Sequence, residues 1–399
     1  MNTSRTSAPR ASSKSRAITR FQEVAKTAAI IATSFLLWSC ASGPGPVFVP
    51  SGPVTTTTRP GDDGSLPPSI TQAKSRWVPV RWSDLPGFDD DKLFEAWNAW
   101  LKSCERPGAT FAPLCGEVRR LSIASAEEQR AWMTSRLRPY RVESLNGPVG
   151  GQLTSYYEPL LKASRQQGPG YDVPLYRTPA GLGSRKPWYS RQEIDTLPEA
   201  RAALRGREIA WLADPVDAMS LHIQGSGRLS VLEPDGSQRV VRVAFAGTND
   251  QPFRSPTQWL TERGVRIGAP WTESTKAWAA QNPQSVQTML WTNPRYVFFR
   301  EEPLSELDAA FGPRGAQGVA LTPGRSIAVD PGSIPYGTPV WLASRGSVVN
   351  LQRLVFAQDT GSAIVGAVRA DYFAGTGPEA GEFASRMNQP LQLWVLWPR

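Results

Sequence analysis

Three aspartates in the C-terminal part of the chain stand in settings where a carboxyl group could do chemistry. Asp330 follows Ala-Val and precedes Pro, Asp359 opens Asp-Thr-Gly-Ser, and Asp371 lies between Arg-Ala and Tyr-Phe. A carboxylate among apolar strand residues is costly unless it is hydrogen-bonded or functional. One such group would indicate a structural acceptor of backbone N–H groups, whereas three close together indicate a site that uses carboxyl groups as acids or bases.

The segment Asp359-Thr360-Gly361 matches the signature of the aspartic proteases. That chemistry needs two such carboxyl groups that share one proton. The chain contains a single Asp-Thr-Gly, so a protease of this kind would require a symmetric dimer. The preceding Ala357-Gln358 also lacks the usual apolar pair. We therefore reject this interpretation.

The composition argues against two further kinds of site. The chain has one histidine and three cysteines, too few for the clustered ligands of a zinc enzyme, so we expect no metal and no cofactor. The net charge of +9 invites a nucleic-acid partner, but the first 40 residues hold six Lys and Arg against one Glu. The remainder shows no basic helix or basic aromatic patch, so we expect no nucleic acid.

Residues 1–40 have the layout of a secretory signal. A basic, Ser-rich stretch leads into the apolar run 27–37, which is too short to span a bilayer as a stable helix. Leu37-Trp-Ser-Cys40 resembles a bacterial lipobox and predicts lipidation of Cys40; the alternative is an ordinary signal peptide that ends near a cysteine. Ser42 resembles the outer-membrane sorting pattern. We therefore expect a lipid-anchored protein on the periplasmic face of a Gram-negative outer membrane.

The segments after the signal predict a linker and then a folded body. Residues 41–76 are rich in Gly, Pro, Ser and Thr, which predicts a flexible linker, and folded sequence is expected from Trp77. Because export is expected, Cys104 and Cys115 are predicted to form a disulfide that closes a short loop.

Hydrophobic periods and caps predict the main elements. A helix is expected over 89–102, and a second begins at the capping box Ser125-Ala-Glu-Glu128 and stops before Pro139. Abundant proline and glycine, 36 and 34 residues, favour turns and β structure over a helical bundle. The other expected elements are strands at 239–245 (after a turn at Asp235-Gly236), 340–342, 354–357 and 393–396, and helices at 256–264 and 273–281.

Several short segments occur in order along the folded body. They are Leu153–Leu160, Asp214–Asp217, His222–Gly227, Asn293–Phe299, Gly315–Gly318, Leu321–Arg325, Ala328–Pro331, Ile334–Pro335, Gly337–Thr338 and the segments around Asp359 and Asp371. Together they resemble the membrane-bound lytic murein transglycosylase A family over roughly residues 77–399. The C-terminal part resembles the domain named for three aspartates. Any single segment is weakly specific, but the ordered set is highly specific.

The resemblance implies a mainly β fold. Residues 77–152 and 301–399 would form a double-psi β-barrel, and residues 153–300 a second, inserted β-barrel-like domain, with helices packed around both. It also implies an enzyme that cleaves the MurNAc–GlcNAc β-1,4 bond of peptidoglycan and leaves 1,6-anhydromuramic acid ends. Exolytic cleavage and partnership with other wall-remodelling enzymes belong to the same expectation.

The resemblance also assigns roles to individual residues. Asp371 is expected to be the catalytic acid and base, in a partly desolvated groove that raises its pKa, with Asp359 and Asp330 in support; a purely structural role stays open for both supporting aspartates. Substrate contacts are expected from Tyr156, Tyr157, Glu158, Gln224, Ser226 and Gly227. A core role stays open for Tyr157 and a turn role for Glu158, and His222 is expected to be a core histidine.

Two alternatives to this function remain open from the sequence. A non-catalytic glycan-binding or wall-loosening protein on the same barrel would keep the groove without needing Asp371 to titrate near neutrality. A hydrolytic muramidase would let water attack and would leave reducing ends. The chemistry of the products separates these alternatives.

Overall fold

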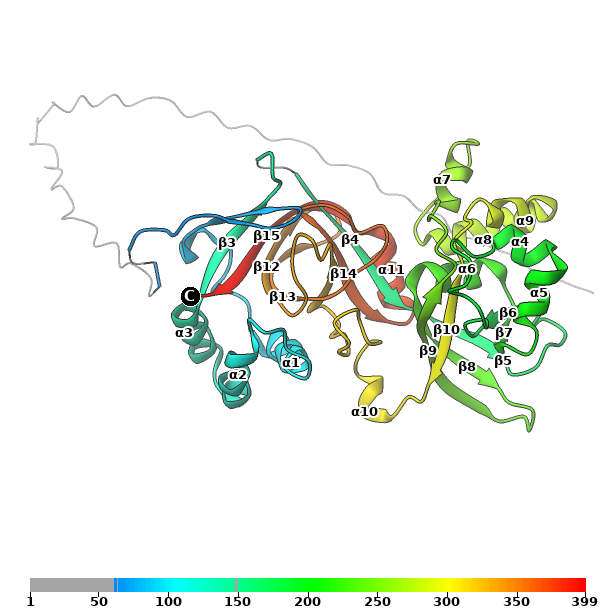
Figure 1. Cartoon of the computed structure of the whole chain (residues 1–399), viewed down its shortest axis with the longest axis horizontal. Helices are drawn as coiled ribbons and strands as arrows, with labels where there is room; N and C mark the ends of the chain where they lie inside the picture. The colour runs from blue at the N-terminus through cyan, green and yellow to red at the C-terminus, as the bar shows by residue number, and fades with distance from the viewer. Residues whose placement is uncertain (1–60, 63, 148–149) are drawn as a thin grey trace, which may run out of the picture. The chain divides into compact units, whose positions relative to one another are not determined.

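The structure, a computed structural model, describes residues 61–62, 64–147 and 150–399. Within these residues the strands form two main sheets, each accompanied by helices (Figure 1). The apolar run 27–37 and Cys40 lie outside the described residues. Among the helices that the structure describes, none combines the length and the apolar character needed to cross a membrane.

The first sheet closes into a ring through strand β4 (Gly151–Glu158). Around the ring the order is β15–β12–β13–β11–β14–β4, and β4 pairs back with β15. The pairs β4–β14 and β11–β13 are parallel, and the other pairs of the ring are antiparallel. The remaining ring strands are β11 (Ser326–Val329), β12 (Pro339–Arg345), β13 (Asn350–Asp359), β14 (Arg369–Thr376) and β15 (Asn388–Pro398).

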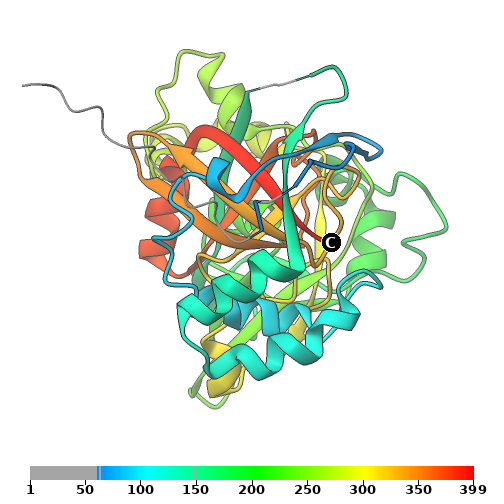
Figure 2. The same ribbon diagram turned by 90° about the vertical axis from the view of Figure 1, so that its left-hand side faces the viewer.

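The ring strands alternate between two hydrophobic cores, as successive side chains of a strand must. Val340 and Leu342 of β12 pack with Val355 in one core, whereas Trp341 and Phe356 pack in a second core with the N-terminal helices. These helices, α1 (Phe94–Ser103), α2 (Cys115–Arg120) and α3 (Ala126–Arg136), lie beside one another in both views (Figures 1 and 2). The sheet continues from β15 through β3 (Leu137–Glu143) and β2 (Arg76–Pro79) to β1 (Ile70–Thr71).

The second sheet lies between β4 and β11 in the chain. Its order is β10-β9-β8-β5-β7-β6, and the edge strands β10 and β6 contact each other without pairing, so the sheet is nearly closed. Its strands are β5 (Leu160–Ser164), β6 (Val173–Tyr176), β7 (Glu208–Leu212), β8 (Ser226–Leu232), β9 (Gln238–Thr248) and β10 (Val297–Glu302). The helices of this region are α4 (Arg191–Thr196), α5 (Pro198–Leu204), α6 (Pro215–Gln224), α7 (Pro256–Thr261), α8 (Trp271–Gln281) and α9 (Pro283–Trp291).

Two short helices complete the fold. α10 (Glu306–Ala309) follows the insert, and α11 (Pro378–Arg386) connects β14 to β15.

The elements predicted from local signals are present. Ser125 caps α3 with the predicted capping box, and Ser255 caps α7. The expected strands fall within β9, β12, β13 and β15, and the helix expected at 273–281 is α8. The Cys104–Cys115 disulfide joins the end of α1 to the start of α2.

The expectation of a mainly β protein is wrong in one respect, because the structure is mixed α/β. Helices α4, α5, α6 and α9 were not predicted, and each has ten residues or fewer, too short for a hydrophobic period to reveal. Their capping signals were present in the sequence: Ser190 and Glu193 form a capping box at α4, and Asp214 caps α6 ahead of Pro215.

Two predicted boundaries also need correction. The linker was expected to run to residue 76, yet β1 pairs with β2, and buried Asp62 accepts hydrogen bonds from the N–H groups of Trp82 and Ser83. The helix expected from residue 89 begins at Phe94, because the Asp91 carboxylate is held by Arg325 and by the backbone of β13.

The chain passes between the two sheets at two points. β4 pairs within the ring over residues 151–158, and β5 begins the second sheet at Leu160. The second sheet ends with β10 at Glu302. The insert was expected to cover residues 153–300, whereas the strands of the second sheet run from Leu160 to Glu302.

Candidate active site

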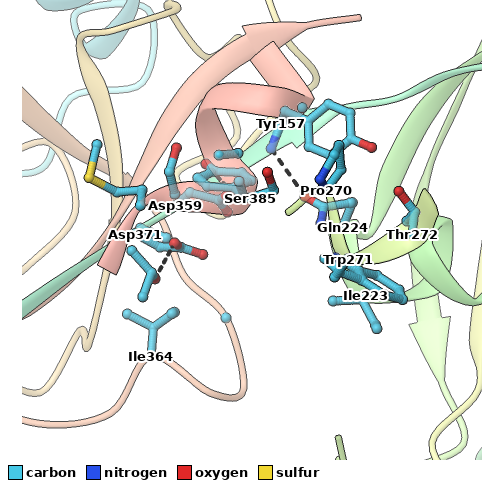
Figure 3. A pocket seen from close by; sticks show the side chains of 18 of the residues that line it. Tyr157, Ile223, Gln224, Pro270, Trp271, Thr272, Asp359, Ile364, Asp371 and Ser385 are labelled. Carbon is cyan, nitrogen blue, oxygen red and sulfur yellow. Dashed lines mark hydrogen bonds between the residues drawn. The ribbon is translucent and has the colours of Figure 1, made fainter. Parts of the chain in front are cut away.

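Strand register brings two of the three aspartates to one pocket. Ala328 of β11 pairs with Asp371 of β14 on one side and with Asp359 of β13 on the other. β4 runs parallel to β14 and places Thr154 opposite Asp371. The pocket has a volume of about 310 Å³ and is lined by both regions of the chain. Figure 3 shows Asp359 and Asp371 facing Trp271 and Gln224 across it.

Asp371 is partly buried and has one hydrogen bond to its carboxylate from the described residues. The Thr154 hydroxyl donates to Oδ1 at 2.5 Å, and Arg369 donates in turn to the Thr154 oxygen at 2.8 Å. Oδ2 has no hydrogen-bond partner within the described parts of the chain. Burial raises the pKa of Asp371 to about 6; the Thr154 hydrogen bond and the charge of Arg369 oppose that rise, and the charge of Asp359 adds to it.

Asp359 differs from Asp371 because both of its oxygens are held. The Tyr156 hydroxyl donates to Oδ2 at 2.8 Å, and the Ala316 N–H donates to Oδ1 at 2.9 Å. Burial raises the pKa of Asp359, against the hydrogen bonds from Tyr156, Thr360 and Ala316. Burial and the neighbouring Asp359 charge raise the pKa of Tyr156 well above its usual value, so the phenol stays a donor.

The other side of the pocket comes from the insert and its junction with the ring. Gln224, at the end of α6, accepts a hydrogen bond from the Tyr157 N–H at 3.1 Å, and both residues line the pocket. A side-chain carbon added at Gly381 of α11 would lie 2.8 Å from the Tyr157 ring. The ring of Tyr157 therefore packs on α11 and also lines the pocket, and its contact with substrate stays a prediction.

Comparison with known proteins identifies the family. A model of the MltA specific insert domain matches residues 152–300, and a model of the 3D domain matches residues 325–397. The structure of LtgG, a lytic transglycosylase of Burkholderia pseudomallei, is 42% identical with a TM-score of 0.56, and the match covers 84% of this chain and 98% of that one. This chain belongs to the lytic murein transglycosylase A family.

Further family members agree with this assignment, which confirms the resemblance found in the ordered motifs. MltA of Neisseria gonorrhoeae is 26% identical with a TM-score of 0.70, and the match covers 85% of this chain and 97% of that one. Membrane-bound lytic murein transglycosylase A of Vibrio cholerae is 29% identical over 254 residues, 61% of this chain and 64% of the relative. The match thus spans slightly less than two thirds of that curated relative.

In this member of the transglycosylase family, the third aspartate lies away from the pocket. Asp330 is buried and accepts hydrogen bonds from Lys74 at 2.8 Å and from the N–H groups of Gly332 and Gly366. Burial alone would raise the pKa of Asp330, but these donors outweigh it and lower the pKa. Asp330 therefore holds loops of the ring together, and its expected support is structural.

The expectation that Glu158, Ser226 and Gly227 contact substrate needs correction. None of the three lines the pocket, and all are buried. The Glu158 carboxylate accepts hydrogen bonds from Arg228 at 2.8 Å and Arg242 at 2.6 Å. A side-chain carbon at Gly227 would lie 2.5 Å from Leu221, so this glycine serves packing rather than sugar binding.

Sequence reasoning missed three residues of the site. Thr154 and Arg369 form the hydrogen-bonded chain that ends on Asp371, and Trp271 lines the pocket from the insert. Arg369 lies two residues before Asp371 on one strand, so strand alternation places both side chains on the same face. Thr154 lies within the quoted segment Leu153–Leu160, but its partner follows only from the β4–β14 register.

His222 is the core histidine that was expected, buried among aromatic rings of the insert. Within the described residues, no group of three or more His, Cys, Asp and Glu side chains is arranged to hold a metal ion.

Proposed function

We propose that this protein cleaves peptidoglycan glycan strands between MurNAc and GlcNAc as a lytic transglycosylase, with Asp371 as both acid and base. The observation that carries the proposal is the environment of Asp371. Its pKa is raised to about 6, it lines the pocket, and its Oδ2 has no partner in the described part of the chain. In about a tenth of the protein molecules at pH 7, a carboxyl group with such a pKa is protonated.

The proposed reaction needs one proton and returns it to the same group. Protonated Asp371 gives its proton to the oxygen that leaves C1 of N-acetylmuramic acid as the C1–O bond breaks, and C1 takes on oxocarbenium character. The resulting carboxylate accepts the proton of the C6 hydroxyl of the same sugar as that oxygen bonds to C1. The product is a 1,6-anhydro end, and no water is consumed.

The state of Asp359 supports a single-carboxylate mechanism. A retaining glycosidase needs a second carboxylate that is free to attack C1. Both oxygens of Asp359 are engaged by Tyr156 and Ala316, so this group is poorly placed to act as a nucleophile. Its negative charge instead favours the protonated form of Asp371.

The opposite side of the pocket offers surfaces suited to a sugar chain. Trp271 and Tyr157 present aromatic rings, whose flat apolar faces fit pyranose rings. Thr272 and Ser385 provide hydroxyl groups among the lining residues. We propose that these residues, rather than Glu158, bind the glycan.

The proposal extends to the organisation of the chain. The two parallel pairs within the six-stranded ring support a double-psi barrel. We assign residues 61–158 and 303–399 to the barrel and 159–302 to the insert. We also propose a signal peptide over 1–40 and an outer-membrane lipid anchor at Cys40, with other wall-remodelling enzymes as partners.

The first test is mass spectrometry of purified peptidoglycan digested by residues 41–399. Anhydro-muropeptides from the wild type and none above background from Asp371→Asn would support both the reaction and the residue. Asp359→Asn is the matched comparison, because it removes a neighbouring charge from the same pocket and should retain partial activity. The length distribution of the products tests the proposed exolytic mode.

Other products would select the alternatives. Reducing ends would show hydrolysis by water. Binding without cleavage by a folded wild type would show a glycan-binding module. Anhydro products from Asp371→Asn at the wild-type rate would place the acid elsewhere and overturn the proposal.

A further inference from the structure

The insert holds a second cavity that the glycan reaction does not use. Its volume is about 720 Å³, and its lining residues include Pro215, Ala218 and His222 of α6. These positions recur at the helical period and form one face of α6. Ile223 and Gln224 of the same helix line the active-site pocket instead. The two cavities therefore share α6 but none of their lining residues.

A buried guanidinium lines this second cavity without a carboxylate partner. Arg191 is only 6% exposed. Its Nε and Nη2 donate to the carbonyl oxygens of Asn293 and Arg295, and Nη2 also lies 2.8 Å from His222 Nδ1. Within the described parts of the chain, Nη1 makes no hydrogen bond and no ion pair involves Arg191. A buried charge of this kind is costly without an opposite charge.

His222 adds a second unused donor beside Arg191. Because a guanidinium can only donate, His222 Nδ1 must be the acceptor, and the proton of the neutral ring is on Nε2. His222 is 6% exposed, and Nε2 is buried without a hydrogen-bond partner among the described residues. Burial and the Arg191 charge lower the pKa of His222 well below its usual value, which keeps the ring neutral.

A carboxylate lies close to Arg191 in the cavity without pairing with it. Asp195 is four residues further along α4, which places both side chains on one face of the helix. Its Oδ2 accepts from Gln287 and Trp291, and Oδ1 has no partner within the described residues. The cavity thus presents a buried cation and an unfilled carboxylate oxygen along one helix face.

We propose that this cavity binds a small zwitterion, an amino acid or a short peptide with a free carboxylate. The ligand carboxylate takes hydrogen bonds from Arg191 Nη1, and its ammonium group donates to Asp195 Oδ1. Exposed Arg205 and half-buried Glu208 also line the cavity and add one charge of each sign. The volume of about 720 Å³ is in the range of small-molecule sites and exceeds the need of a dipeptide.

The binding site stands independently of the proposed catalytic function. Its residues do not touch Asp371, and binding is measured without any cleavage. The same carboxylate chemistry is offered by a free peptide and by a peptide attached to the cell-wall glycan. α6 connects the site to Gln224 of the active-site pocket.

The single histidine of the chain makes the test direct. ¹⁵N-NMR of the His222 ring in the folded protein should show the neutral Nε2–H form at pH 7. Addition of D-alanyl-D-alanine should shift the ring nitrogens, and calorimetry should show saturable binding. The dipeptide amide lacks the carboxylate and the N-acetyl dipeptide lacks the ammonium, so each should bind at least about tenfold more weakly, the loss of one charge-assisted contact. A disaccharide-peptide, whose peptide N-terminus is acylated, should also bind at least about tenfold more weakly than the free dipeptide, and tighter binding would overturn the assigned role of Asp195.

Variants separate the site from its surroundings. Arg191→Met should abolish binding, and Arg205→Gln, at an exposed position that is safe for folding, should weaken it about threefold as a peripheral charge. Arg239→Gln removes an exposed cation of the insert outside the cavity and should bind like the wild type, as should Asp371→Asn. No saturable binding and no ring shift at 10 mM dipeptide, about the weakest affinity a built site would have, would overturn the proposal. Equal binding of the dipeptide and its amide would overturn it as well.

Discussion

Two carboxylates, Glu158 at the end of strand β4 and Asp371 on the neighbouring strand β14, have opposite surroundings. At its end Glu158 is fully buried and accepts hydrogen bonds from Arg228, Arg242 and Thr376. Asp371, opposite the middle of β4, has one donor in the described residues, the hydroxyl of Thr154. Two cations therefore neutralise the carboxylate of Glu158. The carboxylate of Asp371 has no cation bonded to it directly within the described residues.

The difference supports a structural role for Glu158 and the proposed chemical role of Asp371. Arg228 and Arg242 also donate to the carbonyl oxygen of Phe311. The cluster around Glu158 therefore links the segment that leaves the ring after β4 to the segment that returns to it after β10. In the pocket, the charge of Arg369 acts on Asp371, but Arg369 donates its hydrogen bond to Thr154 rather than to the carboxylate. This arrangement orients Asp371 and still allows burial to raise its pKa to about 6.

The largest expected effect is the loss of activity in Asp371→Asn. Asparagine keeps the size and accepts the Thr154 hydrogen bond, but it cannot give or take the proton. Acid–base catalysis by a positioned group contributes about 10²- to 10⁴-fold, so release of anhydro-muropeptides should fall by at least that factor. Glu158→Gln, assayed under conditions where it is folded, should lose far less; an equal loss would remove the contrast between the two carboxylates.

Glu158→Gln should instead be the variant that loses stability. It leaves the buried guanidinium of Arg242 and the half-buried one of Arg228 without their carboxylate, and breaking a buried pair costs about 3–5 kcal/mol. Urea denaturation of residues 41–399 measures the change in unfolding free energy. Glu382→Gln breaks the exposed pair with Arg386 and serves as the control, with an expected change below about 0.5 kcal/mol. Equal changes in the two variants would contradict the structural role of Glu158.

Thr154→Val should sharpen the comparison by removing the one hydrogen-bond donor to the Asp371 carboxylate that the described residues provide. The hydrogen bond favours the carboxylate, so its loss should raise the pKa of Asp371 further. The limb of the pH–rate profile on which activity falls as the acid ionises should then move to higher pH, and kcat should drop about tenfold because the acid is less well oriented. Ser155→Ala, which removes a hydroxyl bound to the Tyr372 carbonyl, should leave that limb in place.

The smallest expected effect is a pH-dependent gain of stability in Asp371→Asn. Because the folded-state pKa of Asp371 is raised to about 6, the stability it contributes is fully present below pH 3.8 and is lost as pH rises through 6. The amide that replaces the carboxyl group has no charge to desolvate, so at pH 7 the variant should exceed the wild type by about 1 kcal/mol, a value reduced for partial exposure. The advantage should vanish near pH 3.5. A constant difference across this range in thermal unfolding would show that Asp371 does not titrate as described.

Local signals in the sequence were sufficient for several parts of the fold. The capping residues Ser125 and Ser255 marked helix starts correctly, and alternation marked β9. The ordered motifs identified the family and, through it, predicted that Asp371 and Asp359 belong to one site; both line the same pocket. The short helix α6 was not predicted, although Asp214-Pro215 is a typical helix start, because no hydrophobic period confirms a helix of that length.

The tertiary structure alone decided which polar residues meet. The sequence around Glu158 does not show that Arg228 and Arg242, far along the chain, donate hydrogen bonds to its carboxylate, nor that Glu158 lies outside the pocket. The pairing of Thr154 with Asp371 depends on the register of two parallel strands separated by more than 200 residues. The sequence therefore determined which chemical groups are present and where the local elements begin, whereas register and burial, which are set by contacts across the whole fold, decided which carboxyl group is neutralised and which can keep its proton.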